Sequence, residues 1–297
     1  MAKIKILCTS TGAIQFAPER YQKYNIGIVD IHFIFKGVEY LESEMEPEKF
    51  YAELEALEDP RNNLPKTAMP TMAEIHAHFD KAVEQGYDTI IAYTISTGLG
   101  GTYNAFLNAV KEYDKKIDIH VVNTKIAAFS EGIHAIRAAQ MVEDGYTVEE
   151  ILKESEWAIK NQEFFGIDGK LDYLIYNGRL KGAKAFMGQV LKICPVLHFN
   201  REGEIEPVES VRTQKKALIR LCEKMKEIIG DRDTKDYLLF RIYTGAAMID
   251  LLKEAEAKTG LAPNHENVVM TPVSGCHNGP WLAAYGFYKI RREDESL

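Results

Sequence analysis

The chain has 297 residues, of which 46% are hydrophobic, so it can bury a full core and has the length of about two domains. Its formal net charge of −8 argues against general binding to nucleic acid or to an anionic membrane, because both need a net basic surface. The N-terminal apolar run is too short for a signal peptide, and no run of about 18 apolar residues is present, so we expect a cytoplasmic protein with at most transient membrane contact. The four cysteines lack the close spacing of a zinc or redox site, which predicts reduced thiols and no metal.

The first half of the chain alternates apolar strands with amphipathic helices. Strands are predicted at 3–8, 26–35, 89–95 and 117–122, and helices at 18–24, 47–57, 71–85, 102–113, 130–144 and 148–161. Thr71 and Thr147 are the expected N-caps, because Glu74 and Glu150 occupy the capping-box positions. The repeated order of strand and helix indicates parallel βαβ units with right-handed crossovers.

The regular alternation of strands and helices ends near Glu163. Strands are then predicted at 164–167, 195–199, 205–211, 237–243 and 268–273, and helices at 171–176, 183–192, 214–229 and 246–258. We therefore expect an α/β protein with two domains, in which residues 1–162 form a parallel sheet flanked by helices and residues 163–297 form an α+β domain. No long linker separates the two, so a cleft between them is the default ligand site, and the loop at 66–70 is expected near this interface.

Two strand ends in the first half carry turns rich in glycine and hydroxyl groups. One turn contains Ser10, and the other contains Ser96 and Thr97 before Gly98 and Gly100. Carboxyl ends of parallel strands meet at the sheet edge where open α/β folds bind ligands. Hydroxyl and backbone N–H groups there can accept an anion without a metal, although an ordinary strand-to-helix turn explains the second loop about equally well.

Thr67 and His277 are weaker candidates by themselves. Thr67 lies in a loop bounded by prolines, where a hydroxyl that only stabilises a turn is the simplest account. His277 is predicted in a loop after an apolar strand, where Gly275 and Gly279 would expose its ring, although a lone loop histidine is more often structural. Ser274 lacks the flanking glycine of a nucleophile elbow, so no standard catalytic signature is present.

A stripe of basic residues runs through the helix predicted at 214–229. It is either the solvated face of an amphipathic helix or a surface that docks an acidic protein. Arg212 lies just before this helix. Arg179 is also a candidate for docking an acidic protein, and the alternative is that it forms a structural salt bridge.

Several separated motifs stand in the order found in one protein family. They are the hydroxyl-rich turn at 9–12, Lys66-Thr67 with Pro70, Ile95-Ser96-Thr97 with Gly101-Thr102-Tyr103, Asn177-Gly178-Arg179, Val211-Arg212, and His277 with Gly279-Pro280. The sequence resembles the DegV family over nearly its whole length. The combination is specific, although each motif alone is weak.

The resemblance implies a two-domain DegV-like fold that holds a long-chain fatty acid between the domains, as the fatty-acid-binding subunit of bacterial fatty acid kinase does. It implies that Thr67, either Ser96 or Thr97, and His277 hold the carboxylate. It also implies no cofactor and no catalytic residue in this chain, because a partner kinase subunit binds ATP and phosphorylates the acyl carboxylate.

In kinase-linked members, exposed arginines of the second domain dock the kinase, which by position implies Arg179 and Arg212 here. Further positions are implied as neighbours of the pocket or head group: Ser10, Gly98, Gly100, Asn278 and Trp281. Trp281 stands where the family usually has glycine, so its ring would narrow the pocket, select a different acyl group or keep the ligand out.

Two other hypotheses remain open from the sequence. The first is an enzyme that acts on a small carbonyl or carboxylate compound, with His277 as base or covalent handle. The second is a regulatory protein-interaction module that uses the basic helix at 212–226.

Overall fold

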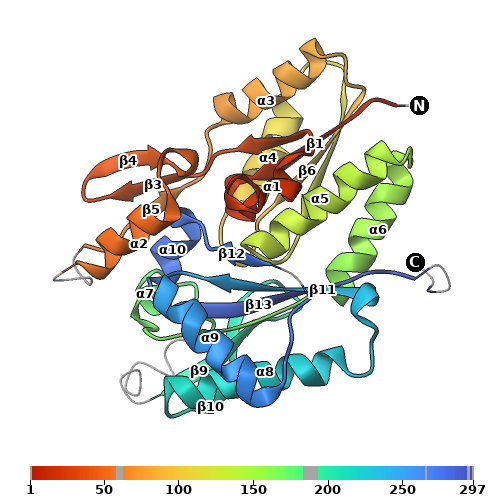
Figure 1. Cartoon of the computed structure of the whole chain (residues 1–297). Coiled ribbons are helices and arrows are strands. Elements are labelled where there is room, and N and C mark those ends of the chain that lie inside the picture. The colour runs from red at the N-terminus through yellow and green to blue at the C-terminus, as the bar shows by residue number, and fades with distance from the viewer. Residues whose placement is uncertain (1, 58–62, 183–192, 265, 293–294, 296–297) are drawn as a thin grey trace.

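The computed structural model describes residues 2–57, 63–182, 193–264, 266–292 and 295. Three sheets with helices between and around them make up this part of the chain (Figure 1). The first sheet is wholly parallel, in the order β2 (Ile26–Val29), β1 (Ile4–Thr9), β6 (Thr89–Thr94), β7 (Asp118–Asn123). The second is antiparallel, in the order β4 (Val38–Leu41), β3 (His32–Phe35), β5 (Lys66–Ala68).

The third sheet belongs to the second half of the chain and is mainly antiparallel. Its order is β10 (Ile205–Val211), β9 (Cys194–Phe199), β8 (Glu163–Asp168), β13 (Leu282–Lys289), β11 (Tyr237–Tyr243), β12 (Asn267–Val269). Only the pair of β11 and β12 is parallel. The predicted domain boundary falls in the short connection between α6 (Val148–Asn161) and β8.

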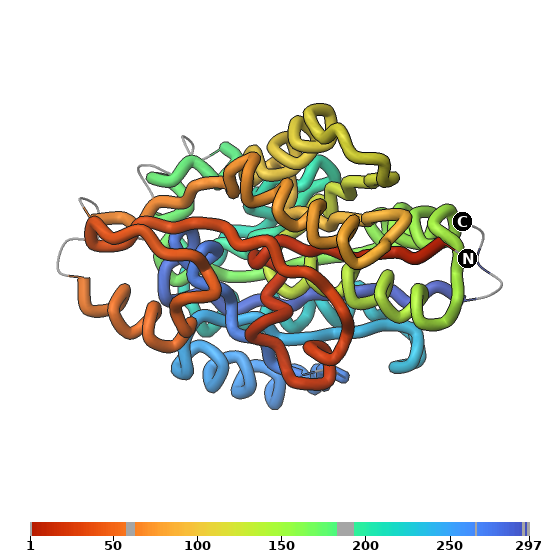
Figure 2. The backbone as a smooth tube through the Cα atoms, turned by 90° about the horizontal axis from the view of Figure 1, so that it is seen from above, coloured from red at the N-terminus to blue at the C-terminus, as the bar shows by residue number. Residues whose placement is uncertain are grey.

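Helices separate and cover the two larger sheets in five layers (Figure 1). From one side to the other, the layers are α3 (Met72–Glu84) with α4 (Thr102–Glu112), the first sheet, α5 (Phe129–Glu143) with α6, the third sheet, and α8 (Gln214–Ile229) with α9 (Ala246–Thr259). The shorter helices are α1 (Glu19–Gln22), α2 (Pro47–Glu55), α7 (Asp172–Tyr176) and α10 (Pro272–Asn278). The view from above places β3, β4 and α2 at one end of the molecule and α6 at the other (Figure 2).

The central strand β6 is apolar at successive positions because both of its faces are covered. Ile90 and Ala92 pack in the cluster under α3 and α4, whereas Ile91 and Tyr93 pack in the cluster that contains α5. A strand of a parallel sheet with helices on both faces has this composition. The expected α/β fold with a parallel sheet flanked by helices is therefore confirmed, and so are the capping boxes at Thr71 and Thr147.

One hydrophobic cluster continues from the first half of the chain into the second. Helix α5 supplies Phe129, whose ring meets Tyr21 edge-on at a centroid distance of 5.0 Å and Phe240 of β11 at 5.1 Å. All three rings are buried. The two halves thus share a core around α5, which holds the strand ends of the first and third sheets in a fixed relation.

The prediction of one strand over 26–35 is wrong, because the chain changes sheets at Asp30 and Ile31. The Asp30 carboxylate accepts hydrogen bonds from the backbone N–H and hydroxyl of Ser43, at 3.0 and 2.9 Å. The backbone N–H of Ile31 donates to the Ser10 hydroxyl at 3.0 Å. These bonds turn the chain out of the first sheet, so β3 pairs with β4 and β5 instead.

The prediction of a strand over 268–273 is also wrong beyond β12. Pro272 occupies the first turn of α10, and the Thr271 hydroxyl accepts a hydrogen bond from the backbone N–H of Ser274 as the N-cap. Proline favours the first helical turn because its missing N–H would have no partner there anyway. His277 therefore lies on a helix and not in an exposed loop. The helix predicted at 183–192 lies outside the described residues.

None of the helices in the described ranges has both the length and the apolar composition needed to cross a bilayer.

Candidate functional site

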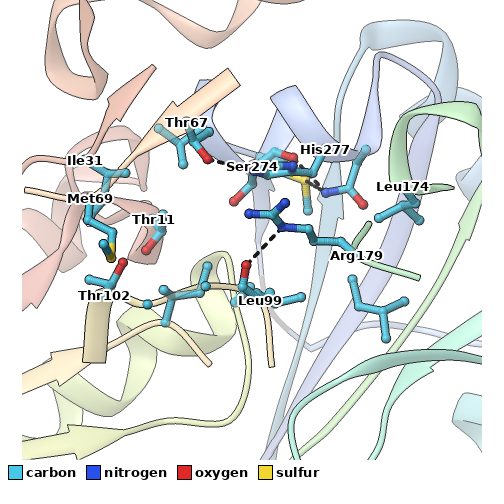
Figure 3. Close-up of a pocket in the computed structure, with 18 of the residues that line it drawn as sticks. Thr11, Ile31, Thr67, Met69, Leu99, Thr102, Leu174, Arg179, Ser274 and His277 are labelled. Atoms are coloured by element: carbon cyan, nitrogen blue, oxygen red, sulfur yellow. Dashed lines mark hydrogen bonds between the residues drawn. The ribbon is translucent and has the colours of Figure 1, made fainter. Parts of the chain in front are cut away.

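A largely apolar cavity of about 540 Å³ lies where the carboxyl end of the first sheet, the small second sheet and the third sheet meet. Its polar lining residues include Thr11, Thr67, Thr102, Arg179, Ser274, His277 and Asn278. Its apolar lining includes Ile31, Leu99, Ala127, Phe164, Leu174, Phe199, Ile205 and Leu282. Segments far apart in the sequence therefore form its wall. Figure 3 shows Thr67, Arg179, Ser274 and His277 on one side of the cavity and Thr11 and Thr102 on the other.

Thr67 and His277 meet at the wall of this cavity. The expected loop at 66–70 is wrong over 66–68, because these residues form β5, where the pairing of Thr67 with Phe33 of β3 fixes the direction of its side chain. The Thr67 hydroxyl lies 3.0 Å from Nε2 of His277 on α10 (Figure 3). Residues separated by 210 positions in the chain thus form one polar pair.

The position of α10 is fixed by hydrogen bonds to its first turn and to the residues just before it. The Tyr51 hydroxyl donates to the carbonyl oxygens of Met270 and Thr271, at 3.0 and 3.1 Å. The Glu42 carboxylate accepts from the backbone N–H of Val273 at 2.8 Å. His277 is therefore carried by a rigid element, which suits a group that orients a ligand.

The imidazole of His277 is neutral at physiological pH. Burial, together with the nearby Arg179 guanidinium, lowers the pKa of His277 to about 3. Its Nδ1 atom is buried and has no hydrogen-bond partner among the described residues. The ring therefore offers hydrogen bonds but no positive charge.

Ser274 is a site residue that the sequence reasoning missed. Its side chain is buried, it lines the cavity, and its hydroxyl has no partner within the described part of the chain. Ser274 and His277 are three positions apart, so they share a face once the segment is helical. The signal was present in the sequence, but it could be read only after the segment was known to form a helix.

Ser96 and Thr97 do not line the cavity. The Ser96 hydroxyl donates to the carbonyl oxygen of Gly203 at 2.7 Å and accepts from the backbone N–H of Gly98 at 3.1 Å. The exposed Thr97 hydroxyl accepts from the Asn123 side-chain amide at 3.0 Å. The Ser96 bond joins the loop after β6 to the turn between β9 and β10, and the Thr97 bond joins it to the end of β7. The structure does not bring the two hydroxyls to His277.

The other predicted neighbours divide into two groups. Gly100 and Asn278 line the cavity, whereas Ser10, Gly98 and Trp281 do not. Ser10 donates to the buried Glu42 carboxyl group. The ring of Trp281 lies under the Lys170 ammonium, 3.7 Å from the ring centroid, and Trp281 is not among the described residues that line the cavity.

The two predicted docking arginines lie in different surroundings. Arg212 is exposed between β10 and α8. Arg179 is partly buried and lines the cavity, where its Nε donates to the carbonyl oxygen of Leu99 at 3.1 Å (Figure 3). Its Nη1 donates to the carbonyl oxygen of Asn177.

Two buried carboxyl groups support the turn behind the cavity. Glu131 accepts hydrogen bonds from Thr9 and from Thr11, the latter at 2.8 Å, and Glu42 accepts from Ser10. Burial raises the pKa of Glu131 to about 8 and that of Glu42 to about 7. Within the described residues, no group of three or more histidine, cysteine or acidic side chains is placed to hold a metal ion.

The wild-type protein should lose stability as the pH rises because Glu131 titrates. Glu131→Gln should lack this contribution to the pH dependence. The pKa of Glu131 is about 8 in the folded protein against an ordinary value of 4.5, so the folded state holds a proton that the unfolded state releases between these values. Stability from this group is complete below pH 4.5 and is lost as the pH rises through about 8, by up to about 1.4 kcal/mol per pH unit.

Denaturant unfolding of wild type and Glu131→Gln, measured at several pH values, tests this expectation. The difference between the two free energies of unfolding reports Glu131 together with its electrostatic coupling to Glu42, because the remaining titrating groups are common to both proteins. The stability of the wild type relative to the variant should fall steadily from about pH 5 to about pH 8. Parallel curves would contradict the expectation.

Comparisons with known proteins match almost the whole chain. The model of the DegV family matches residues 3–289. A fatty acid-binding protein of Thermotoga maritima is 30% identical over 300 residues, which cover 98% of this chain and 99% of that protein. The crystal structure of a fatty acid binding DegV family protein from Streptococcus agalactiae has a TM-score of 0.86 at 28% identity, over 98% of this chain and 100% of the other. That of DegV, a fatty acid binding protein from Bacillus subtilis, has a TM-score of 0.81 at 26% identity, over 97% and 100%.

Proposed function

Because the chain belongs to the DegV family, we propose that it binds a long-chain fatty acid in the cavity, with the carboxylate at Thr67 and His277. The observation that carries the proposal is the polar pair of Thr67 and His277 at the wall of an otherwise apolar cavity. Ser274 supplies a third donor, because its buried hydroxyl has no other partner among the described residues. The acyl tail lies among the apolar side chains.

The energetics favour an amphiphile with a long tail. Each hydrogen bond from a donor to an ion contributes roughly 1.5–3 kcal/mol net, so a few donors only partly compensate the cost of burying a carboxylate. About 15 methylenes at ~0.8 kcal/mol each contribute on the order of 12 kcal/mol before the entropy of binding is subtracted. The tail therefore supplies most of the affinity, and the polar groups orient the head.

We also propose that the protein presents the acid to a partner kinase subunit that forms the acyl phosphate, and that this chain is not itself the catalyst. The exposed Arg212 supports this proposal, because an arginine at the surface can pair with an acidic partner. The four unpaired cysteines favour the reducing cytoplasm as the location. Capture of a kinase subunit by the wild-type protein, lost on charge reversal at Arg212, tests the partner.

The fatty-acid proposal is tested by organic extraction of the purified protein and mass spectrometry of the extract. Wild type should carry long-chain fatty acid. His277→Ala and Thr67→Val should each weaken binding by about 10- to 100-fold, because each removes one hydrogen bond to a charged group.

His120→Ala is the matched control, because His120 is on β7, away from the cavity wall, where it pairs with Asp118. Circular dichroism checks that every variant is folded. Unchanged lipid occupancy in folded His277→Ala would count against the proposed head-group position, and wild-type protein free of lipid that also binds no added fatty acid would refute the function.

A further inference from the structure

A head-group site formed by Thr67, Ser274 and His277 alone contains no positively charged side chain. Thr67 and Ser274 are neutral, and burial together with the Arg179 charge lowers the pKa of His277 to about 3. A carboxylate in an apolar cavity is costly when only neutral donors surround it, and a nearby cation reduces that cost. The chemistry of a fatty acid therefore calls for a cation at this cavity.

Arg179 is the one charged side chain in the described lining of the cavity, and no aspartate or glutamate lines it. No ion pair joins Arg179 to a carboxylate of the described residues. The hydrogen bonds of its guanidinium go to main-chain carbonyl oxygens, from Nε to Leu99 at 3.1 Å and from Nη1 to Asn177. Nη2 is left without a protein partner in the described ranges.

The guanidinium lies beside the proposed head-group position. Figure 3 shows it extending into the cavity, with Leu99 on one side and Ser274 and His277 on the other. The Arg179 charge is close enough to lower the pKa of His277, and partial burial lowers the pKa of Arg179 itself. A partly desolvated cation without an anionic partner is stabilised when a carboxylate arrives.

On the premise of the proposed function, we propose that Arg179 pairs with the carboxylate of the bound fatty acid and makes the cavity select anionic lipids over neutral lipids of the same length. The two carbonyl contacts hold the guanidinium in place, which reduces the loss of side-chain entropy on binding. Arginine keeps its charge at all physiological pH values, so the selectivity does not depend on protonation of His277.

The experiment compares dodecanoic acid with dodecanol, which share a tail and differ in the charge of the head. Binding of each is measured by displacement of a fluorescent fatty-acid analogue from wild type, Arg179→Gln, Arg179→Lys and Arg212→Gln. Wild type should prefer the acid by about 10- to 100-fold, the range of one strong charge-assisted contact. Arg179→Gln should bring this ratio within about threefold of unity without weakening binding of the alcohol.

Arg179→Lys should keep part of the preference, because lysine retains the charge but not the fixed fork geometry. Arg212→Gln is the matched control and should keep the wild-type ratio, since Arg212 does not line the cavity. The preference of the wild type should also persist from about pH 7 to about pH 9, whereas a site that depended on protonated histidine would lose it.

The outcomes separate this inference from the function on which it rests. An acid preference that survives in Arg179→Gln overturns the inference and leaves the fatty-acid function standing. Loss of acid and alcohol binding together in Arg179→Gln also overturns it, because the arginine would then only hold the shape of the cavity. A wild-type protein that binds neither compound refutes the function itself.

Discussion

Palmitate is expected to bind this protein on the order of ten thousand times more tightly than octanoate. The two acids share a head group and differ by eight methylenes, each of which contributes about 0.8 kcal/mol when it leaves water. The cavity of about 540 Å³ offers these methylenes an apolar lining that includes Ile31, Leu99 and Leu282. The estimate is lower than the full sum because a tail gives up some freedom on binding.

A displacement titration with saturated acids of increasing length checks this prediction. The affinity should rise with each added carbon until the tail reaches Phe164 and Phe199, whose rings meet edge-on at a centroid distance of 5.3 Å. Both rings also line a second hollow of about 330 Å³, so they separate the two spaces. The corresponding alcohols are the control and should give the same slope. A change of less than about tenfold across the series would mean that the tail stays in water.

Phe129→Ala is expected to lower the free energy of unfolding by about 3–5 kcal/mol. This is the range for truncating a large buried aromatic side chain, because the transfer free energy is lost and a cavity remains. The Phe129 ring is fully buried between Tyr21 and Phe240, at the point where α5 joins the two halves of the chain. Both halves should therefore lose stability together.

Urea unfolding followed by circular dichroism and by tryptophan fluorescence measures this effect. Each half of the chain contains one tryptophan, because Trp157 is on α6 and Trp281 immediately precedes β13. The two signals should change at one midpoint, shifted down by about 1 M or more in the variant. Tyr146→Ala, at an exposed aromatic position, is the control and should change little. Separate midpoints for the two signals would show that the halves unfold independently.

Much of the fold could be predicted because its signals are local. The apolar run of β6 indicated a strand covered on both faces, and Thr71 with Glu74 marked a helix start, as the structure confirms. The two strand errors had different causes. After β2 the chain leaves the first sheet because Asp30 accepts hydrogen bonds from Ser43 and the backbone N–H of Ile31 donates to the Ser10 hydroxyl. After β12, by contrast, a helix begins at Pro272 with Thr271 as its N-cap.

The candidate site was less predictable because hydroxyl groups look alike in a sequence. Ser96 and Ser274 both follow apolar stretches of sequence, but the Ser96 hydroxyl is bonded to Gly203, whereas Ser274 lines the cavity and its hydroxyl has no partner in the described residues. Arg179 carried an expected docking role, and its place in the cavity wall depends on Leu99, which is 80 positions away.

The sequence by itself determined most of the order of strands and helices, the apolar run inside β6, and the presence of Thr67 and His277 as chemical groups. These properties depend on periodicity and capping, which act over a few neighbouring residues. Only the tertiary structure decided that Thr67 and His277 meet, that Ser274 and Arg179 join them, and that Ser96 turns away. The reason is that side chains from several sheets and helices converge on the cavity, and their convergence follows from how those elements pack around the shared core at α5.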